Sequence, residues 1–304
     1  MDAQNGFYKL TDCQLIFIVG MQKSGTNLMK RLLLHSGIVE SPGKGEFQDL
    51  WGNRPYFSPT AFPAGTIYQK YHGLQGHQIN VDEATMAVQE VLQERLAAAI
   101  SGKKAAILNK SPYNSVRLPW LRALFPNSFI VAMVRQPLSN LFSLLKKFIP
   151  HDRRRTAPED GWWGVKPARW QEMVSEKKVI QCAYQWEAVN QKLWHDRAYI
   201  DMVVSYQQLC EQAQKLVELI LSRALKRPIL LPAAFPVLKC FNEEYQHGAA
   251  LRSKNSYYRP TGNRFDIPSK ENIELLPLTE QEVVKIREIC DPTALALQSL
   301  LLGI

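Results

Sequence analysis

The chain contains little cysteine, no long hydrophobic run and no low-complexity tract. Its 304 residues include five cysteines, which are far apart and form no C-x-x-C pair; this spacing argues against a zinc site and favours a reducing compartment. The amino-terminus lacks the basic start of a signal peptide, and the longest early apolar run, residues 15–21, is too short to cross a bilayer. We therefore expect a cytoplasmic protein with no transmembrane segment and no bound metal.

Basic residues exceed acidic ones, with 37 Lys and Arg against 28 Asp and Glu and a formal net charge of +9. Such an excess suits nucleic acid, a membrane surface or an anionic substrate. The charge is scattered, and the one dense run, residues 153–155, falls where a loop is expected. That run is either a solvated loop or a contact for an anionic ligand. Because a nucleic-acid-binding stripe needs several clusters on one face, we expect no nucleic-acid partner.

Short apolar runs alternate with stretches of helical periodicity. The expected strands cover residues 14–20, 105–109, 129–134 and 202–205. The expected helices cover residues 26–36, 81–100, 138–148, 171–194 and 209–225. Strands that alternate with helices predict an α/β fold, in which a parallel β-sheet is flanked by helices on both faces.

Three stretches interrupt this pattern, residues 41–77, 151–170 and 230–268, and they are rich in glycine, proline, aromatic or basic residues. In an open α/β sheet, ligands bind beyond the carboxyl ends of the strands, and long loops are often lids or binding segments. No linker divides the chain. We therefore predict a single domain over residues 1–304, with a core of about 14–226 and the three stretches as acceptor or lid loops.

The loop after the first expected strand has the features of an anion site. It reads Gly20-Met-Gln-Lys-Ser-Gly-Thr-Asn27 and opens the first expected helix. Backbone N–H groups of such a loop and helix terminus can hold a phosphate, and Lys23 adds a positive charge. The order differs from the Walker A motif, because Thr26 and not lysine follows Gly25. An ordinary strand-to-helix turn with a solvent-facing lysine is the alternative.

A second potential anion site follows the third expected strand. Arg135 stands at the end of that strand, and Ser143 lies eight residues later in the next expected helix. A strand end and the second turn of the following helix can converge on one anion, and the planar guanidinium group suits a phosphate. Taken alone, this pair favours the alternative, a helix-flanking arginine and a surface serine, over an anion site.

Together these motifs resemble those of the sulfotransferases that use 3′-phosphoadenosine-5′-phosphosulfate (PAPS) and release the 3′,5′-bisphosphate (PAP). The segment Lys23-Ser-Gly-Thr26 resembles the 5′-phosphosulfate loop of that family, and Arg135 with Ser143 resembles its 3′-phosphate pair. Tyr206-Gln-Gln-Leu209 resembles the adenine-contacting Tyr-x-x-Leu segment. Asn255-Ser256 resembles a late segment that closes over the nucleotide in bacterial members.

The resemblance covers most of the chain, from about residue 15 to 265, and is greatest to the bacterial and tyrosylprotein sulfotransferase branch. It implies the P-loop-like nucleotide-binding fold of that family. The residues that it implies for PAPS binding are Gln22, Lys23, Ser24, Gly25, Thr26, Asn27, Arg135, Ser143, Tyr206, Asn255 and Ser256. Lys23 and Lys110, each close to a strand end, are implied to stabilise charge on the leaving oxygen, with no metal required.

The resemblance also implies a base for the acceptor. Phenol-type members use a histidine in a Lys-Thr-His segment, but this chain has Lys110-Ser-Pro there. The tyrosylprotein branch uses a glutamate in a Gly-Glu segment, which makes Glu46 the candidate base. Less favoured bases are Glu40, His72, His77 and His151.

These features predict an enzyme, a PAPS-dependent sulfotransferase acting on a hydroxyl or amine of a small-molecule, lipid or carrier-bound acceptor. Aromatic residues of the loops either line the acceptor pocket or cap the core: Trp51, Tyr56, Phe57, Trp162, Trp163 and Trp170. A small-molecule or nucleotide kinase is disfavoured by the order of the phosphate-loop motif. A non-catalytic nucleotide-binding module is disfavoured because Lys23 and Lys110 are present. The acceptor and the oligomeric state stay open.

Overall fold

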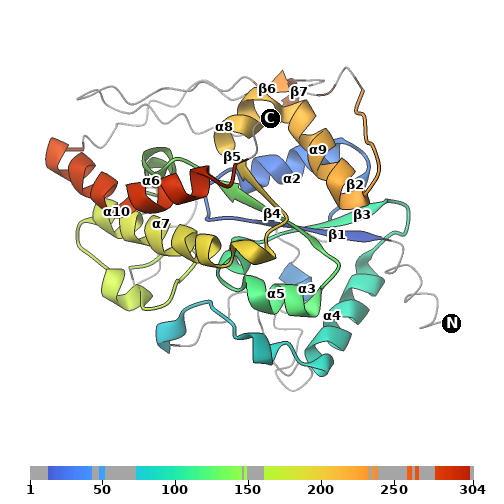
Figure 1. Ribbon diagram of the computed structural model, residues 1–304, viewed down its shortest axis with the longest axis horizontal. Helices are drawn as coiled ribbons and strands as arrows, with labels where there is room; N and C mark the ends of the chain where they lie inside the picture. The colour runs from blue at the N-terminus through green and yellow to red at the C-terminus, as the bar shows by residue number, and fades with distance from the viewer. Residues whose placement is uncertain are drawn as a thin grey trace.

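A five-stranded parallel sheet with the order β2-β3-β1-β4-β5 forms the centre of the molecule (Figure 1). The computed structural model describes residues 13–42, 48–51, 73–145, 147–148, 161–232, 235, 237–238, 259–261, 264–266 and 278–301. The strands are β1 (Gln14–Val19), β2 (Val39–Glu40), β3 (Ala106–Lys110), β4 (Phe129–Val134) and β5 (Met202–Ser205). The predicted α/β fold is confirmed, with β2 as an additional, two-residue edge strand.

Helices cover both faces of the sheet because successive strand side chains point to opposite sides. Ile16 and Ile18 of β1 lie in one hydrophobic cluster, and Phe17 and Val19 lie in the other. The first face is covered by α2 (Thr26–His35), α8 (Tyr206–Glu211) and α9 (Ala213–Leu225), and the second by α3 (Gln48–Trp51), α4 (Met86–Ala99) and α5 (Leu118–Leu124). The strands are buried on both sides, which explains their nearly continuous apolar sequences.

A third cluster lies beside the sheet, where three helices pack on one another (Figure 1). These helices are α6 (Pro137–Leu145), α7 (Lys178–His195) and α10 (Glu280–Gln298). Helix α10 was not predicted, although Thr279 and Glu282 form a capping box at its start. The T-x-x-E pattern before an apolar stretch is a sequence signal for a helix N-terminus and would have located it.

The stretches predicted to be irregular contain more structure than expected. A second sheet, of order β6-β8-β7, consists of β6 (Val237–Leu238), β7 (Arg259–Thr261) and β8 (Arg264–Asp266). Of the short 3₁₀ helices, η1 (Gly73–Gln75) lies in one of these stretches and η4 (Trp170–Met173) begins at the end of another, whereas η2 (Val81–Glu83), η3 (Pro112–Val116) and η5 (Arg197–Tyr199) lie outside them. Element η2 occupies the start of the helix predicted over 81–100, and α4 begins only at Met86. The helix predicted over 209–225 is divided, because the non-helical backbone of Gln212 separates α8 from α9. Elements of two to five residues are too short to show a periodicity.

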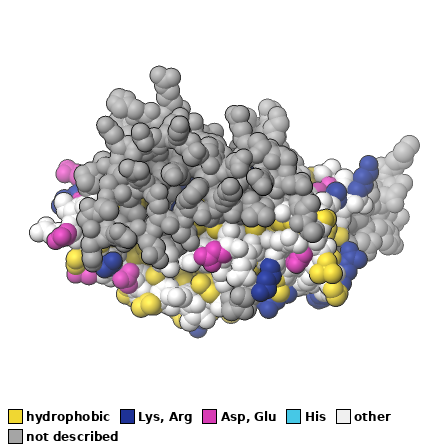
Figure 2. All heavy atoms as spheres, turned by 90° about the horizontal axis from the view of Figure 1, so that it is seen from above, with side chains coloured by type: hydrophobic (Ala, Val, Ile, Leu, Met, Phe, Trp, Pro, Cys, Tyr) yellow, Lys and Arg dark blue, Asp and Glu magenta, His cyan; other side chains and the backbone are white. Residues whose placement is uncertain are grey.

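The described residues carry both signs of charge. Figure 2 shows Lys and Arg side chains interspersed with Asp and Glu over the described part of one face. Among the described helices, none combines the length and apolar character that a membrane span requires.

The cysteines differ in their bonding. Cys13, Cys182 and Cys290 are free, but Cys210 is disulfide-bonded, which the cysteine spacing did not predict. The reducing compartment therefore stays a prediction.

Candidate active site

Most predicted site residues lie where the parallel strands end. The phosphate loop, residues 20–25, follows β1, Lys110 is the last residue of β3, Arg135 follows β4, and Tyr206 follows β5. The strand register aligns the ends of neighbouring strands, with Ile18 opposite Lys110 and Val134 opposite Ser205. The carboxyl ends of parallel strands share one edge of the sheet, which is the usual ligand-binding edge of such folds.

The phosphate loop is a tight turn that is held by hydrogen bonds of its backbone amides. The Gly20 amide donates a 2.7 Å hydrogen bond to Ser115 Oγ of η3, and the Ser24 amide donates to the Met21 carbonyl. Lys23 has a φ of 71°, in the left-handed region. The buried Ser24 hydroxyl has no hydrogen-bond partner in the described part of the chain. A buried orphan hydroxyl beside an anion-type loop fits a ligand phosphate oxygen.

Helix α2 begins directly after this loop with its first amides open to a ligand. Its N-cap is Gly25, no described side chain caps it, and its first turn contains no acidic residue. Uncapped N–H groups and the helix dipole favour an anion at this point. Thr26 is buried and Asn27 is exposed, so these two neighbours have very different access to a bound group.

The ring of Tyr206 lies directly on Gly25. A Cβ atom added to Gly25 would approach the Tyr206 ring carbon Cδ2 to 2.6 Å, and Gly25 has a φ of 106°. Only glycine satisfies both the backbone conformation and this close approach. The start of α8, where Tyr206 lies, is therefore packed on the start of α2, although the two are about 180 residues apart in the sequence.

Arg135 joins three separate segments of the candidate site. Its Nη1 atom donates to the Lys23 carbonyl at 3.1 Å and to Ser143 Oγ at 3.3 Å. Its guanidinium carbon lies 4.3 Å from the centre of the Tyr206 ring, a cation–π distance. The predicted pair of Arg135 and Ser143 thus meets in the fold, and the arginine adjoins the phosphate loop and the tyrosine as well.

Lys110 ends β3 with its side chain only 2% exposed. By strand alternation it lies on the same face as Ala106 and Leu108, which is the face that α2 covers. The next residue, Ser111, donates its amide to the Ile18 carbonyl at the end of β1. Lys110 is therefore held beside the strand that leads into the phosphate loop.

The aromatic residues of the loops divide into core residues and one residue of the site. Trp51, Trp162 and Trp170 are buried, and Trp162 packs edge-on against Trp170 with ring centres 5.6 Å apart. Trp163 is only partly buried, and its ring centre lies 5.4 Å from Lys23 Nζ. Trp163 is thus the described member of this group that adjoins the phosphate loop, whereas Tyr56 and Phe57 lie outside the described residues.

The core position of Trp51 is explained by Arg117, a residue that the sequence analysis did not select. The Arg117 guanidinium is fully buried and lies 5.8 Å from the Trp51 ring centre and 5.5 Å from that of Trp120. It donates to Asn114 Oδ1 at 3.1 Å, and burial lowers its pKa to about 9. This cluster fixes α3 against the sheet and is structural.

Of the candidate bases, only His77 and Glu40 lie among the described residues. Glu46, His72 and His151 lie outside the described residues, as do Asn255 and Ser256. The buried His77 accepts a hydrogen bond from the Lys166 amide through Nδ1, so its ring is committed to the fold. Glu40 accepts the Ser101 amide at the edge strand. The Gln22 amide group is also committed, because it bonds to the backbone of Trp163 and Val165.

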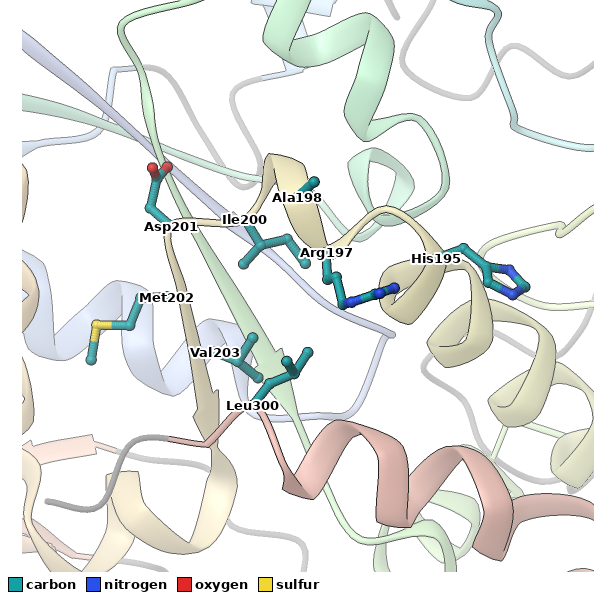
Figure 3. A pocket seen from close by; sticks show the side chains of 8 residues that line it. All are labelled: His195, Arg197, Ala198, Ile200, Asp201, Met202, Val203 and Leu300. Atoms are coloured by element: carbon teal, nitrogen blue, oxygen red, sulfur yellow. The ribbon is translucent and has the colours of Figure 1, made fainter.

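A cavity of about 510 Å³ lies at the opposite end of β5, lined by residues that include Asp201, Met202 and Leu300 (Figure 3). Its charged groups do not converge, because the His195 ring and the Asp201 carboxylate lie at opposite ends of the labelled group. The Asp201 carboxylate already accepts hydrogen bonds from Arg122 and from the Ile130 amide. The geometry therefore favours the carboxyl edge as the candidate active site.

Comparison with protein families decides the identity. The model of the sulfotransferase family matches residues 15–224, which include all the loops described above that contain the candidate site and the whole central sheet except for Gln14. The chain belongs to the sulfotransferase family. This sulfotransferase is 26% identical over 176 residues to a Caenorhabditis briggsae protein described as "Putative protein-tyrosine sulfotransferase". The match covers 56% of this chain and 54% of that relative, so it spans about half of the relative's length.

Solved structures resemble this sulfotransferase at low sequence identity. The crystal structure of a sulfotransferase from Alicyclobacillus acidocaldarius has 16% identity and a TM-score of 0.49, with 94% of each chain covered. That of sulfotransferase STF9 from Mycobacterium avium has 14% identity and a TM-score of 0.44, covering 74% of this chain and 67% of that one. Within the described residues, no group of three or more His, Cys, Asp or Glu side chains is arranged to hold a metal ion.

Proposed function

We propose that this sulfotransferase takes its sulfuryl group from PAPS and transfers it to a hydroxyl or amine of a small-molecule, lipid or carrier-bound acceptor. The observation that carries the proposal is the position of Arg135, whose guanidinium contacts the phosphate loop, Ser143 and Tyr206 together. A donor with phosphate groups on both the 3′- and the 5′-oxygen of its ribose needs two neighbouring anion sites, and this arrangement supports them.

The residues present fit such a donor. The uncapped start of α2 and the orphan hydroxyl of Ser24 suit the 5′-phosphate. Arg135 and Ser143 suit the 3′-phosphate, because a guanidinium and a hydroxyl offer charge-assisted hydrogen bonds. Tyr206 adjoins both groups and would contact the adenine.

The donor supplies an activated sulfuryl group, and the chain's own residues would supply position and charge. Lys23 extends from the phosphate loop, and Lys110 lies at the end of the neighbouring strand. Both ammonium groups would stabilise negative charge that develops on the departing phosphate oxygen. Glu46 is our proposed base, which would accept the proton of the acceptor.

Thermal unfolding with ligands tests this proposal. PAP is expected to raise the Tm of the full chain without added metal by an amount that grows with PAP concentration, because a ligand that binds only the native state stabilises it. ATP with Mg²⁺ is expected to raise the Tm much less. A larger shift with ATP and Mg²⁺ would favour a kinase instead. PAP binding without any release of PAP from PAPS would indicate a non-catalytic module.

Gly25→Ala is expected to weaken PAP binding by about tenfold or more, since it adds a methyl group against Tyr206 at a strained φ. The PAP affinity is measured by calorimetry. Gly37→Ala is a matched control, because Gly37 also has a positive φ, of 71°, but a Cβ there would meet nothing within 4 Å. An equal loss of PAP affinity in both variants would show that backbone strain alone, and not the contact with Tyr206, causes the effect.

A further inference from the structure

The partly buried indole ring of Trp163 lies beneath an ammonium group of the phosphate loop. Lys23 Nζ is 5.4 Å from the centre of the ring, within the distance of about 6 Å at which a cation and an aromatic ring attract each other. Among the aromatic side chains, the indole ring attracts a cation most strongly. The two residues are far apart in the sequence, so their contact is a product of the fold.

The main chain that carries this ring is held by two buried glutamines. The Gln185 amide of α7 donates to the Trp163 and Val165 carbonyls, at 3.0 Å each. Gln22, which belongs to the phosphate loop, donates to the Trp163 carbonyl at 3.3 Å and accepts from the Val165 amide at 3.4 Å. These hydrogen bonds hold the ring and the phosphate loop in a fixed relation to each other.

Gly164 allows the Trp163 segment to approach the phosphate loop closely. It has a φ of 89°, and a Cβ atom at this position would lie 2.3 Å from Gln22 Nε2. Only glycine satisfies both the backbone conformation and this close approach. The ring of Trp163 is therefore presented from backbone that packs directly on the residue before Lys23.

A lysine that acts on a developing charge benefits from a neighbour that restricts its side chain. The lysine ammonium is at the end of a flexible four-carbon stem, and ordering this stem costs conformational entropy. A charge that is in place before the reaction stabilises the transition state without that cost. The bond from Arg135 Nη1 to the Lys23 carbonyl fixes the backbone of Lys23. The ring of Trp163, in contrast, is in contact with the ammonium group itself.

We propose that Trp163 is a positioning residue, whose indole ring holds the Lys23 ammonium group in the orientation that sulfuryl transfer requires. The inference rests on the proposed function, because that function assigns Lys23 to the charge that develops on the departing phosphate oxygen. The indole ring takes no part in the bond changes. It acts through Lys23, by limiting the rotamers that the ammonium group can adopt.

Removal of the ring tests this role. Trp163→Leu is expected to lower kcat by about tenfold, because a small misplacement of a reacting or stabilising group is costly. The kcat is measured as PAP formation from PAPS with 4-nitrophenol in excess as the acceptor. The PAP affinity, measured by calorimetry, should stay unchanged, because Gln22 and Gln185 still bond to the backbone of this segment. Trp163→Phe keeps an aromatic face and should lower kcat by about threefold or less.

Double variants separate a positioning role from a structural one. In the Lys23→Met background, Trp163→Leu should cause no further fall in kcat, because the group on which the ring acts is already absent. Lys147→Met is the matched background, since Lys147 Nζ lies 5.5 Å from the centre of the same ring. There, Trp163→Leu should still lower kcat by about tenfold. General damage to the fold would lower kcat in both backgrounds.

A measurement without PAPS reports the contact directly. The lysines of the full chain are given isotope-labelled methyl groups by reductive methylation, which keeps their charge, and are observed by NMR. The signal of Lys23 is identified by its absence from Lys23→Met. We expect the ring current of Trp163 to shift this signal upfield. In Trp163→Leu the signal should move to the position of an exposed lysine such as Lys103.

Several results would overturn the inference. An unchanged kcat in Trp163→Leu, a further tenfold fall in the Lys23→Met background, or a Lys23 signal without an upfield shift each contradicts it. A loss of the Trp163→Leu effect in Lys147→Met alone would show that the ring acts through Lys147. If the wild type forms no PAP from PAPS but the Lys23 signal is shifted and this shift depends on Trp163, the donor proposal fails and the orienting role of the ring stands.

Discussion

Lys23→Met is expected to lower kcat by about 10²- to 10³-fold and to leave the PAP affinity nearly unchanged. The variant removes the ammonium group that would face the sulfuryl group, but it retains the Lys23 carbonyl, which holds Arg135 at 3.1 Å. Methionine also keeps a Cβ at the φ of 71°, so the loop experiences no new backbone strain. The chemical step should suffer far more than nucleotide binding, because transition-state charge exceeds ground-state charge at this point.

The kcat is measured as the rate of PAP formation from PAPS with a phenolic acceptor in excess. The PAP affinity is measured by calorimetry. Lys103→Met is the control, since Lys103 is an exposed lysine in the turn before β3. Two results would contradict the role of Lys23: an unchanged kcat, or a fall in PAP affinity as large as the fall in kcat.

Arg135→Met is expected to weaken PAP binding by about 10²-fold, the cost of losing a charged, forked phosphate contact. The substitution removes the hydrogen bonds to Ser143 Oγ and the Lys23 carbonyl together with the stacking on Tyr206. Arg135→Lys keeps the charge but loses the planar fork, so an intermediate affinity is expected. Ser143→Ala removes one neutral donor and should cost about tenfold or less.

Arg122→Met is the matched control for the arginine series. Arg122 is paired with Asp201 at 2.6 Å and bonds to the Ser128 and Tyr199 carbonyls, away from the candidate site. This control should lower the Tm and leave the PAP affinity of the folded protein unchanged. If Arg135→Met binds PAP as tightly as the wild type, the 3′-phosphate lies elsewhere and the proposed donor site is wrong.

Local sequence features were sufficient for four of the five strands of the central sheet and for the contact between Arg135 and Ser143. The strands over 129–134 and 202–205 were predicted with the bounds that the structure has, because each is a buried apolar run that ends at a polar residue. Arg135 and Ser143 are eight residues apart across a strand end and a helix, so their contact follows from ordinary local geometry. In contrast, β2 and the 3₁₀ helices are too short to produce a pattern.

The sequence by itself determined the fold class, four of the five strands of the central sheet and the family resemblance, because these depend on periodicity and on motifs within a few residues. Tertiary structure alone decided which aromatic residue adjoins the site. Trp162 and Trp163 are neighbours in the sequence, but the first is buried against Trp170 and the second lies beside Lys23 and Lys147. The contact between Tyr206 and Gly25 likewise joins residues far apart in the chain. Such contacts depend on how whole elements pack, and no local pattern in the sequence records them.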